Sequence, residues 1–413
     1  MKFERYPIND RLKSALDELG FKRPTDIQYK CIPSILKGED LLAIAQTGTG
    51  KTAAFLIPVL ELILKQKKKD KYSKNPLALI MVPTHELALQ CEKVARSFAK
   101  NLKIKCQAII GGVSQDPQIH ALQNGVDLLI ATPGRMFDLI AQGHLITKDV
   151  RILILDEADH MLEVGFLNDI YDILRKIPKR RQTLFFSATI NQQIKKTAYK
   201  IVKQNAIRIQ FSPDNPVSEN VDHKVMLVDM DHKRFFLERV FQENKESKIL
   251  VFTRTKVRCE RVHAAMERVE VESNFIHGDK SQAQREEILK NFGEAESGML
   301  IGTDVIARGI DVPSIDLVIN YDLPTEPENY VHRVGRTGRF NKKGFAYSFC
   351  APEEKPLLLE IENTIGKKID FIKLSELEYD ETLNIHRERK KDYDSIMEEI
   401  EDFERRKKRK KKL

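Results

Sequence analysis

The sequence predicts an α/β protein with two parallel sheets in tandem, each covered by helices on both faces. Short apolar runs alternate with helix-length segments in both halves of the chain, the pattern of parallel strands joined by helices. The pattern stops at the polar stretch 211–224, which contains Pro213 and Pro216, and then restarts. A chain of 413 residues also exceeds the length at which a single core keeps growing, so two domains are expected.

The apolar runs give the expected strands and the domain limits. In the first half they are 40–45, 77–82, 104–110, 127–131, 151–155 and 183–188. In the second half they are 224–229, 248–253, 273–277, 298–303, 316–321 and 345–350. The domains that follow are an N-terminal domain at 1–211, a linker at 212–223, a C-terminal domain at 224–372 and a charged extension at 373–413.

Composition excludes several classes of protein. No uncharged apolar run approaches the roughly 18 residues of a membrane-spanning helix, and the charged N-terminus is unlike a secretion signal. The five cysteines are scattered without a CxxC pair, which indicates neither a zinc site nor a disulfide framework. A reducing, cytoplasmic location without membrane attachment is therefore expected.

The net charge of +8 belongs to the end of the chain. Residues 405–412, "RRKKRKKK", carry eight positive charges, so residues 1–404 sum to zero. From about Asp380 onward few apolar residues remain to bury, which predicts a solvated helix or a disordered arm. A solubilising tail, a nucleic-acid arm and a nuclear-import signal would share this composition.

A phosphate-binding loop is predicted at "AQTGTGKT". The string follows an expected strand and precedes the helical run 53–64, which is the context that a P-loop requires. Gly48 and Gly50 let backbone N–H groups approach phosphate oxygens, aided by the helix N-terminus. Lys51 would reach the β- and γ-phosphates, and the Thr52 hydroxyl would ligate Mg²⁺. The residues expected to surround ATP here are Ala45, Gln46, Thr47, Gly48, Thr49, Gly50, Lys51 and Thr52, with Ala45 where the strict pattern has glycine.

Three carboxylates, Asp156, Glu157 and Asp159, follow the apolar strand 151–155. Clustering them there is unfavourable without a compensating cation. In P-loop NTPases an aspartate at such a strand end holds magnesium. We therefore expect Asp156 to bind Mg²⁺, largely through water, and Glu157 to polarise the water that attacks the γ-phosphate. Without the P-loop upstream, the same acids would fit a helix N-cap cluster equally well.

These motifs, with their companions, resemble the DEAD-box ATP-dependent RNA helicases from about Phe3 to Lys368. The companions in the first half are "GFKRPTDIQ" (20–28), "PTHELA" (83–88), "GG" (111–112), "TPGR" (132–135), "DEAD" (156–159) and "SAT" (187–189). Those in the second half are "VFTRT" (251–255), "HGDKSQAQR" (277–285), "TDVIARGID" (303–311) and "HRVGRTGR" (332–339). The resemblance implies two tandem RecA-like domains that hydrolyse ATP in the cleft between them.

The resemblance also assigns the nucleotide contacts. A glutamine can pair bidentately with the N6/N7 edge of adenine, and Gln28 stands in the family's Q motif. Thr25 would support it, and Phe21 or Phe3 would stack on the base. Alone, Gln28 would more readily be a structural residue. Asp311 would hydrogen-bond the ribose.

Catalysis and coupling are expected to use residues from both domains. Arg336 and Arg339 resemble arginine fingers for the γ-phosphate, each worth on the order of 10³-fold or more in turnover. His332 would sense the nucleotide. Ser187 and Thr189 look like the hydroxyl pair that couples hydrolysis to strand separation by bonding Asp159. The catalytic residues expected overall are Lys51, Asp156, Glu157, Arg336 and Arg339.

RNA would be held by its backbone. Thr132 is a good N-cap and Pro133 suits the first helical position, so this helix start is a ready phosphate site, although an ordinary helix cap would look the same. By resemblance, the RNA contacts are Thr84, Gly112, Thr132, Gly134 and Arg135 in the first domain and Arg254, Gln282, Arg285 and Thr303 in the second. Contacts to phosphate and sugar carry no base information, so binding would be independent of sequence. Preference for RNA over DNA rests on the family alone.

Four positions depart from the family pattern. His85 stands where arginine is usual, Asp26 where proline is usual, Ile306 where alanine is common and His160 where arginine is frequent. His85 and Asp26 bear on RNA affinity and coupling. None of the four touches the expected catalytic residues, so the chemistry should be retained.

The expected function is an ATP-dependent RNA helicase of compact bacterial type that locally unwinds short duplexes or remodels RNA–protein complexes. RNA and ribosomal or RNA-decay proteins are the expected partners of a monomer. The alternatives are an RNA-binding clamp or scaffold with weak ATPase activity and a DNA-directed helicase. A P-loop GTPase is disfavoured because "NKES" (244–247) and "NKKG" (341–344) lack the aspartate of a guanine-reading Asn-Lys-x-Asp motif.

Overall fold

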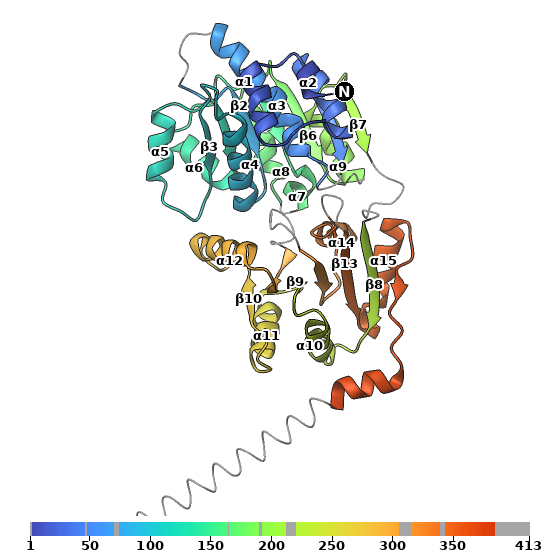
Figure 1. Cartoon of the computed structure of the whole chain (residues 1–413). Coiled ribbons are helices and arrows are strands. Elements are labelled where there is room, and N and C mark those ends of the chain that lie inside the picture. Colours follow the sequence, from blue (N-terminus) through green and yellow to red (C-terminus); the bar gives the residue numbers. More distant parts are fainter. Residues whose placement is uncertain are drawn as a thin grey trace, which may run out of the picture. The chain divides into compact units, whose positions relative to one another are not determined.

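The computed structural model describes residues 2–45, 48–69, 74–163, 165–189, 192–211, 220–304, 315–338 and 343–384. The chain divides into two compact units, the first made mainly of Met1–Ser218 and the second mainly of the residues from Glu219 onward. Each unit contains one seven-stranded sheet (Figure 1), and every recorded pairing between named strands is parallel. The expected α/β fold class, with two parallel sheets in tandem, is confirmed.

The sheet of the first unit has the strand order β3-β4-β2-β5-β6-β1-β7. Its strands are β1 (Leu41–Ala45), β2 (Ala78–Met81), β3 (Cys106–Ile109), β4 (Leu128–Ala131), β5 (Ile152–Leu155), β6 (Gln182–Ser187) and β7 (Ile207–Phe211). Its helices are η1 (Phe3–Arg5), α1 (Asp10–Glu18), α2 (Asp26–Leu36), α3 (Lys51–Lys69), α4 (His85–Phe98), α5 (Asp116–Gln123), α6 (Pro133–Ala141), α7 (Ala158–Glu163), α8 (Leu167–Lys176) and α9 (Gln192–Ile201).

Both faces of this sheet are buried, because alternate strand residues enter different apolar clusters. Leu41 and Ala43 of β1 pack in the cluster that includes residues of α1 to α4, whereas Leu42 and Ile44 pack in the cluster that includes α6, α8 and α9 (Figure 1). A strand buried on both faces must be apolar at every position. This is why β1, β2, β4 and β5 appear in the sequence as uninterrupted apolar runs.

The sheet of the second unit has the order β10-β11-β9-β12-β13-β8-β14. Its strands are β8 (Val221–Leu227), β9 (Lys248–Phe252), β10 (Ser273–Ile276), β11 (Gly298–Gly302), β12 (Leu317–Asn320), β13 (Gly344–Cys350) and β14 (Asp370–Phe371). The helical segments that follow β8 in the chain are α10 (Lys233–Glu243), α11 (Lys256–Glu267), α12 (Gln282–Glu294), α14 (Pro327–Val334), η2 (Pro352–Glu354) and α15 (Lys355–Ile365).

Three features of the strands differ from the sequence expectation. β7 and β14 were not expected, and both lie at an edge of their sheet, where a strand pairs on one side only. β8 begins at Val221, inside the stretch expected as linker, because Val221 already pairs with Gly344 of β13. Residues 212–219 of that linker lie outside the described residues.

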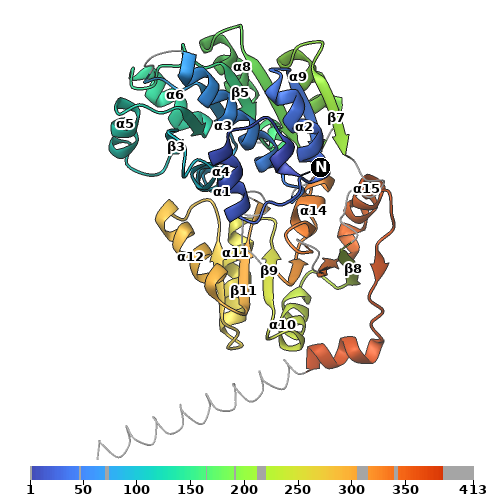
Figure 2. The same cartoon turned by 45° about the horizontal axis from the view of Figure 1, so that its top comes forward.

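The C-terminal extension starts with a packed segment. Residues 376–384 are helical, and the Tyr379 ring lies 4.8 Å from that of Phe236 on α10. Arg239 donates to the Thr382 hydroxyl at 3.0 Å, so the chain is held on α10 as far as this residue (Figure 2). The expected solvated character from about Asp380 therefore does not apply to Thr382, which is buried. Among the described residues, no helix has the length and apolar character needed to cross a membrane.

Candidate nucleotide and RNA sites

Three of the expected motifs meet at one edge of the first sheet. The P-loop follows β1, the "SAT" string begins at the last residue of β6, and the "DEAD" string follows β5. β6 pairs with β1 on one side and with β5 on the other. Since these strands are parallel, their carboxyl ends lie side by side, which is where α/β sheets bind ligands.

The P-loop adopts the backbone that its glycines permit. Gly48 has a φ of 81° and Gly50 a φ of 90°, both in the left-handed region that favours glycine. A Cβ at Gly50 would also collide with the Gln28 amide. Gln46 and Thr47, which we expected to line the ATP site, lie outside the described residues.

Gln28 connects helix α2 to the P-loop. The Thr25 N–H donates to Gln28 Oε1 at 3.0 Å, and Gln28 Nε2 donates to the Gly50 carbonyl at 3.2 Å. The Thr25 hydroxyl donates to the Thr49 carbonyl at 2.9 Å. A primary amide has two N–H donors and two acceptor lone pairs, so capacity for a base remains. The adenine contact of Gln28 stays a prediction, beside a structural role that the coordinates show.

The aromatic residues expected near the base form a cluster of their own. The ring of Phe21 meets that of Phe98 edge to face at 5.3 Å and lies 6.3 Å from that of Phe3. Phe3 is buried, whereas Phe21 is partly exposed. Of the two rings proposed for stacking, Phe21 is thus the more accessible.

Lys51 and Asp156 are buried charged groups at this edge. Lys51 begins α3 with 7% of its surface exposed, and among the described residues its Nζ has no hydrogen-bond partner. Burial raises the pKa of Asp156 to about 7, although the neighbouring Lys51 lowers it. Buried polar groups in folded proteins are normally paired. An ammonium without an acceptor and a carboxylate whose charge is disfavoured fit a ligand that brings anionic oxygens and a cation.

A metal held by protein side chains alone does not fit the described part of the chain. Within it, no three His, Cys, Asp or Glu side chains gather closely enough to hold a metal ion. Thr52, in the first turn of α3, and Asp156 are the residues expected to approach Mg²⁺. This donor set suits an ion that keeps most of its waters and takes its remaining ligands from phosphate, as Mg²⁺ does.

Glu157 has a strained backbone. Its φ of 50° lies in the left-handed region, which is uncommon for a residue with a Cβ. Such strain costs of the order of 1–3 kcal/mol and gathers at functional sites. His160, one of the family departures, is buried with Nδ1 3.7 Å from Glu157 Oε2.

Asp159 ties the "DEAD" and "SAT" strings together. Its Oδ2 accepts from the N–H groups of Ala188 at 3.1 Å and Thr189 at 2.9 Å, and from the Thr189 hydroxyl at 3.0 Å. The expected bond from Thr189 to Asp159 is therefore confirmed. The Ser187 hydroxyl differs from the expectation, because it donates to the Thr189 carbonyl at 2.6 Å. Ser187 thus acts on the loop and not on the carboxylate.

The expected RNA residues of the first unit lie at the other half of the same sheet edge. They follow β2, β4 and β3, which are neighbours in the sheet. Thr84 caps α4 by accepting from Leu87 N–H at 3.3 Å. Thr132 occupies the N-cap of α6, as expected, but its hydroxyl makes no capping bond. Gly112 has a φ of 71°, and Gly134 lies in the first turn of α6.

Arg135 and His85 flank the loop that contains Gly112. Arg135 Nη2 donates to the Val113 carbonyl at 2.8 Å. The His85 ring lies so close to Gly111 that an added Cβ would sit 3.3 Å from its Nε2. Burial lowers the pKa of His85, so this departure from the family's arginine replaces a permanent charge with a ring that tends to be neutral.

The expected arginine-finger segment contains one arginine with a structural role. Arg333 is fully buried, and its guanidinium donates to both carboxylate oxygens of Asp304, at 2.5 and 2.9 Å. It also donates to the Asp322 carbonyl at 2.7 Å. Arg336 is buried and donates through Nε to the His332 carbonyl at 3.2 Å, while His332 is itself buried. Arg339, Asp311 and Ile306 lie outside the described residues.

Arg254 belongs to an ion-pair network in the second unit. Its Nη2 lies 2.7 Å from Glu354 Oε1, and the other oxygen of Glu354 pairs with the fully buried Lys233. Asp322 accepts from the Arg254 N–H and pairs with Arg258 at 2.9 Å. The Arg254 side chain keeps 37% of its surface exposed, so its RNA contact stays a prediction.

The remaining expected RNA residues follow neighbouring strands. Thr303 comes directly after β11 and is 7% exposed. Gln282 and Arg285 lie in the first turn of α12, which follows β10, the neighbour of β11. Their position at helix and strand ends is the position that the family pattern implies.

Comparison with known proteins decides the family. Residues 25–197 match the DEAD/DEAH box helicase family, and residues 232–341 match the helicase conserved C-terminal domain. The chain belongs to the DEAD-box family of ATP-dependent RNA helicases. This helicase is 37% identical to ATP-dependent RNA helicase eIF4A of Yarrowia lipolytica over 370 residues, which cover 89% of this chain and 91% of the relative. It is 38% identical to ATP-dependent RNA helicase RhlB of Shewanella woodyi, over 89% of this chain and 84% of the relative.

Solved structures of relatives share the fold of this DEAD-box helicase. One is the DEAD-box helicase Mss116 bound to single-stranded RNA and UDP-BeF, with a TM-score of 0.82 and 29% identity, covering 92% of this chain and 81% of that one. Another is Dbp5 of S. cerevisiae bound to RNA and ADP BeF3, with a TM-score of 0.81 and 28% identity, covering 90% and 95%. The helicase is an enzyme of the RNA-stimulated ATPase class.

Sequence reasoning missed the internal ion pairs of the second unit of this helicase. Lys233 and Glu354 are 121 positions apart, and Arg333 and Asp304 are 29 apart. No local pattern joins residues at such separations. The signal that was present is a charged residue in an otherwise apolar context, such as Asp322, two positions after the end of the buried β12.

Proposed function

We propose that this helicase hydrolyses ATP at the carboxyl edge of β1, β6 and β5 and uses the cycle to separate short RNA duplexes or remodel RNA–protein complexes. The observation that carries the proposal is a buried Lys51 whose Nζ has no hydrogen-bond partner among the described residues, near a buried Asp156 whose pKa is raised to about 7 and an Asp159 that is bonded to the "SAT" loop. The first two groups need a nucleotide and a cation. Asp159 links the nucleotide site to the "SAT" loop, whose conformation can change with the bound nucleotide.

Each residue has a role in this proposal. Lys51 binds the β- and γ-phosphates, and Gly48 and Gly50 present backbone N–H groups to them. Asp156 and Thr52 hold Mg²⁺ largely through water; the bound ion neutralises phosphate charge. Glu157, held close to the site by its unusual backbone, polarises the attacking water. Arg336 and Arg339 stabilise the γ-phosphate, and Asp311 binds the ribose.

RNA is proposed to be bound along its phosphates and sugars. The support is the set of helix N-termini and loops at the carboxyl ends of β2, β4 and β3, where Thr84, Thr132 and Gly112 lie. Such contacts do not depend on base identity. Nucleic-acid stacking averages about 1.4 kcal/mol per step, so disturbing four or five steps costs roughly 6 kcal/mol. One clamping event can supply this, which limits unwinding to short duplexes.

ATP turnover with and without RNA tests the proposal. We expect turnover to rise severalfold with single-stranded RNA and to respond less to DNA of the same sequence. Arg336→Ala should keep ATP binding and lose on the order of 10³-fold in turnover. A rate that stays flat when RNA is added would favour the scaffold alternative, and equal stimulation by DNA would favour a DNA-directed helicase.

The cellular location and the protein partners are also part of the proposal. Five buried thiols and no disulfide among them suit a reducing, cytoplasmic location. Dbp5 of S. cerevisiae has been solved bound to Gle1, so a protein partner is compatible with this architecture. For this helicase we propose ribosomal or RNA-decay proteins as partners of a monomer, testable by crosslinking in cells with and without residues 380–413.

A further inference from the structure

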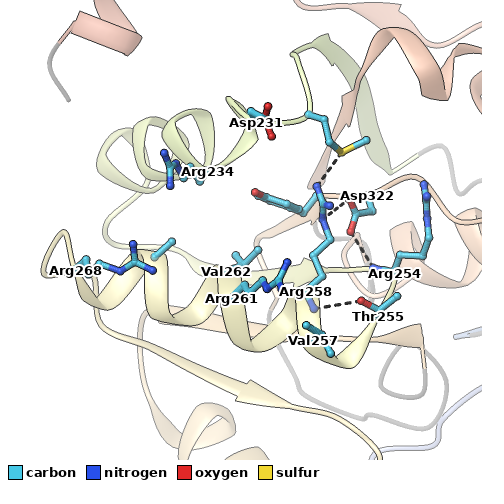
Figure 3. A pocket seen from close by; sticks show the side chains of 13 residues that line it. Asp231, Arg234, Arg254, Thr255, Val257, Arg258, Arg261, Val262, Arg268 and Asp322 are labelled. Atoms are coloured by element: carbon cyan, nitrogen blue, oxygen red, sulfur yellow. Dashed lines mark hydrogen bonds and ion pairs between the residues drawn. The ribbon is translucent and has the colours of Figure 1, made fainter. Parts of the chain in front are cut away.

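The second unit contains a hollow between helices α10 and α11 that the ATP and RNA sites do not account for. It encloses about 720 Å³, with Met230, Asp231 and Arg234 on the α10 side and residues of α11 on the other (Figure 3). Tyr321 and Asp322 form its inner end. We refer to this hollow as the arginine groove.

Positive charge dominates the arginine groove. The arginines that line it are Arg234, Arg254, Arg258, Arg261 and Arg268, and its only lining acids are Asp231 and Asp322. Asp322 is already paired with Arg258 at 2.9 Å. Arg254 is paired with Glu354 at 2.7 Å. The excess of positive charge in the groove is therefore carried by the remaining three arginines, Arg234, Arg261 and Arg268.

The arrangement of these arginines works against the helix that carries them. Arg258 and Arg261 are three positions apart on α11, and Arg268 is the C-cap residue of the same helix. Like charges three or four positions apart destabilise a helix by about 0.2–0.5 kcal/mol per pair. Arg234 and Arg261 are exposed, and in the described part of the chain neither has a carboxylate within ion-pair distance. A ligand with several negative charges would remove this repulsion.

The groove is also lined by apolar residues, which we call its floor. They are Met230, Val257, Val262, Ala265 and Tyr321, and Val257 is 57% exposed. A phosphate backbone would match the arginines but leave this floor uncovered. A peptide that carries both acidic and apolar side chains would match the rim and the floor, which favours a peptide over RNA as the occupant.

The chain contains such a peptide near its end. Residues 394–404 read "DSIMEEIEDFE", a stretch with six acids, no lysine and no arginine. Ile396, Ile400 and Phe403 recur at positions i, i+4 and i+7, the spacing of one face of a helix. This acidic stretch lies outside the described residues. Its composition complements both the charge and the apolar floor of the groove.

The attachment point of the tail lies on the helix that borders the groove. The last described residue is Asn384, two positions after Thr382, which is held by Arg239 of α10. Ten residues from Asn384 to Asp394 span at most about 33 Å when extended. A tether this short gives an effective concentration in the millimolar range, so even weak docking would be populated.

We propose that the acidic stretch 394–404 docks in the arginine groove of its own chain, with its acids on the arginines and its apolar face on the floor. Docking pairs the acids of the stretch with the arginines of the groove instead of with the basic run 405–412 that follows it. The basic run then stands free of its nearest internal counter-charge and is available to another polyanion.

A disulfide trap in the full-length chain tests this proposal. All five native cysteines are buried, so an introduced pair can react selectively. Ala265→Cys on the groove floor is combined with Phe403→Cys in the tail. The matched control combines Phe403→Cys with Leu359→Cys on α15, outside the groove and 59% exposed. We expect the groove pair to form its intramolecular disulfide about tenfold faster, the ratio given by a docking free energy of about 1.4 kcal/mol.

Charge reversal supplies the specificity control. Arg234→Glu with Arg261→Glu should reduce the groove-pair rate to that of the control pair, and Glu398→Lys with Glu401→Lys in the tail should restore it. Lys245→Glu, an exposed residue of the same unit outside the groove, should change nothing. Rescue by the tail variants shows that the groove variants are folded.

Three outcomes would overturn the proposal. Equal rates for the groove and control pairs would mean random encounters of a loose tail. Disulfides that join two chains, detected by mixing chains of different mass, would mean that the groove binds a second copy. A groove-pair rate that ignores Arg234→Glu and Arg261→Glu, while these changes weaken RNA binding, would make the groove an RNA site. The assay reads proximity, so it is independent of ATPase and helicase activity.

Discussion

The nucleotide edge of the first unit and the ion-pair network of the second treat buried charge in opposite ways. At the nucleotide edge, Lys51 is buried without a hydrogen-bond partner among the described residues, and burial raises the pKa of Asp156. In the second unit, Arg333 is fully buried but donates to both oxygens of Asp304. Removing ions from water is costly unless they are paired. A buried charge that its own protein leaves unpaired therefore marks a place for a ligand, and a paired one marks part of the scaffold.

Removing Arg333 should destabilise the second unit, because Arg333 is part of its buried ion-pair network. Arg333→Met removes the guanidinium from Asp304, whose side chain is 34% exposed, and from the Asp322 carbonyl, so the free energy of unfolding should fall by about 1.5–3 kcal/mol. Urea unfolding measures it. Arg261→Met, which removes an exposed arginine, should stay within about 0.5 kcal/mol. Equal losses for the two variants would show that the pairing of Arg333 contributes nothing to the fold.

Removing Lys51 should have the opposite effect on stability. Lys51→Met replaces an unpartnered buried ammonium by an apolar chain, so the nucleotide-free protein should be as stable as the parent or more stable. ATP affinity should fall about 100-fold, the loss expected from one or two charged hydrogen bonds of 1.5–3 kcal/mol each. Calorimetric titration and thermal unfolding measure the two quantities. A variant that is destabilised without nucleotide would contradict the comparison.

The coupling loop offers a smaller test. Thr189→Val removes one of the bonds to Asp159 Oδ2 and leaves the two backbone bonds in place. We expect about 1 kcal/mol of lost stability, with ATP turnover kept and duplex separation reduced. Ser187→Ala removes a bond to a loop carbonyl and should affect unwinding less. A strand-displacement assay run beside an ATPase assay separates the two, and identical behaviour of both variants would remove the distinction between these hydroxyls.

The weakest expected effect is a pH dependence in the second unit. Burial, with a smaller contribution from Lys367, lowers the pKa of His223 from its ordinary value of 6.5, and its Nδ1 lies 3.0 Å from the Tyr330 hydroxyl. Below pH 6.5 the unfolded chain binds a proton that the folded chain resists, so stability falls as the pH falls. His223→Gln should flatten this slope between pH 7 and about pH 5. An unchanged slope in thermal unfolding would exclude His223 as its source.

The sequence was a good guide wherever the relevant residues are consecutive. β5 and the acids after it could be predicted because a strand buried on both faces is apolar at every position and ends at a charged residue. β14 could not, because it has only two residues, both exposed, and exists through pairing with β8. The bond from Ser187 to the Thr189 carbonyl was missed because the loop conformation, and not the residue type, decides which acceptor a hydroxyl meets.

The amide of Gln28 has a consequence for substrate choice. Its Nε2 donates to the Gly50 carbonyl and its Oε1 accepts from the Thr25 N–H at the start of α2. The amide therefore connects the phosphate-binding turn to the segment that would contact the base. A base that engages this amide must share it with the phosphate-binding turn. Binding of the purine to this amide would therefore change the shape of the turn that holds the phosphates. A nucleotide with another base would then be bound more weakly and also hydrolysed more slowly.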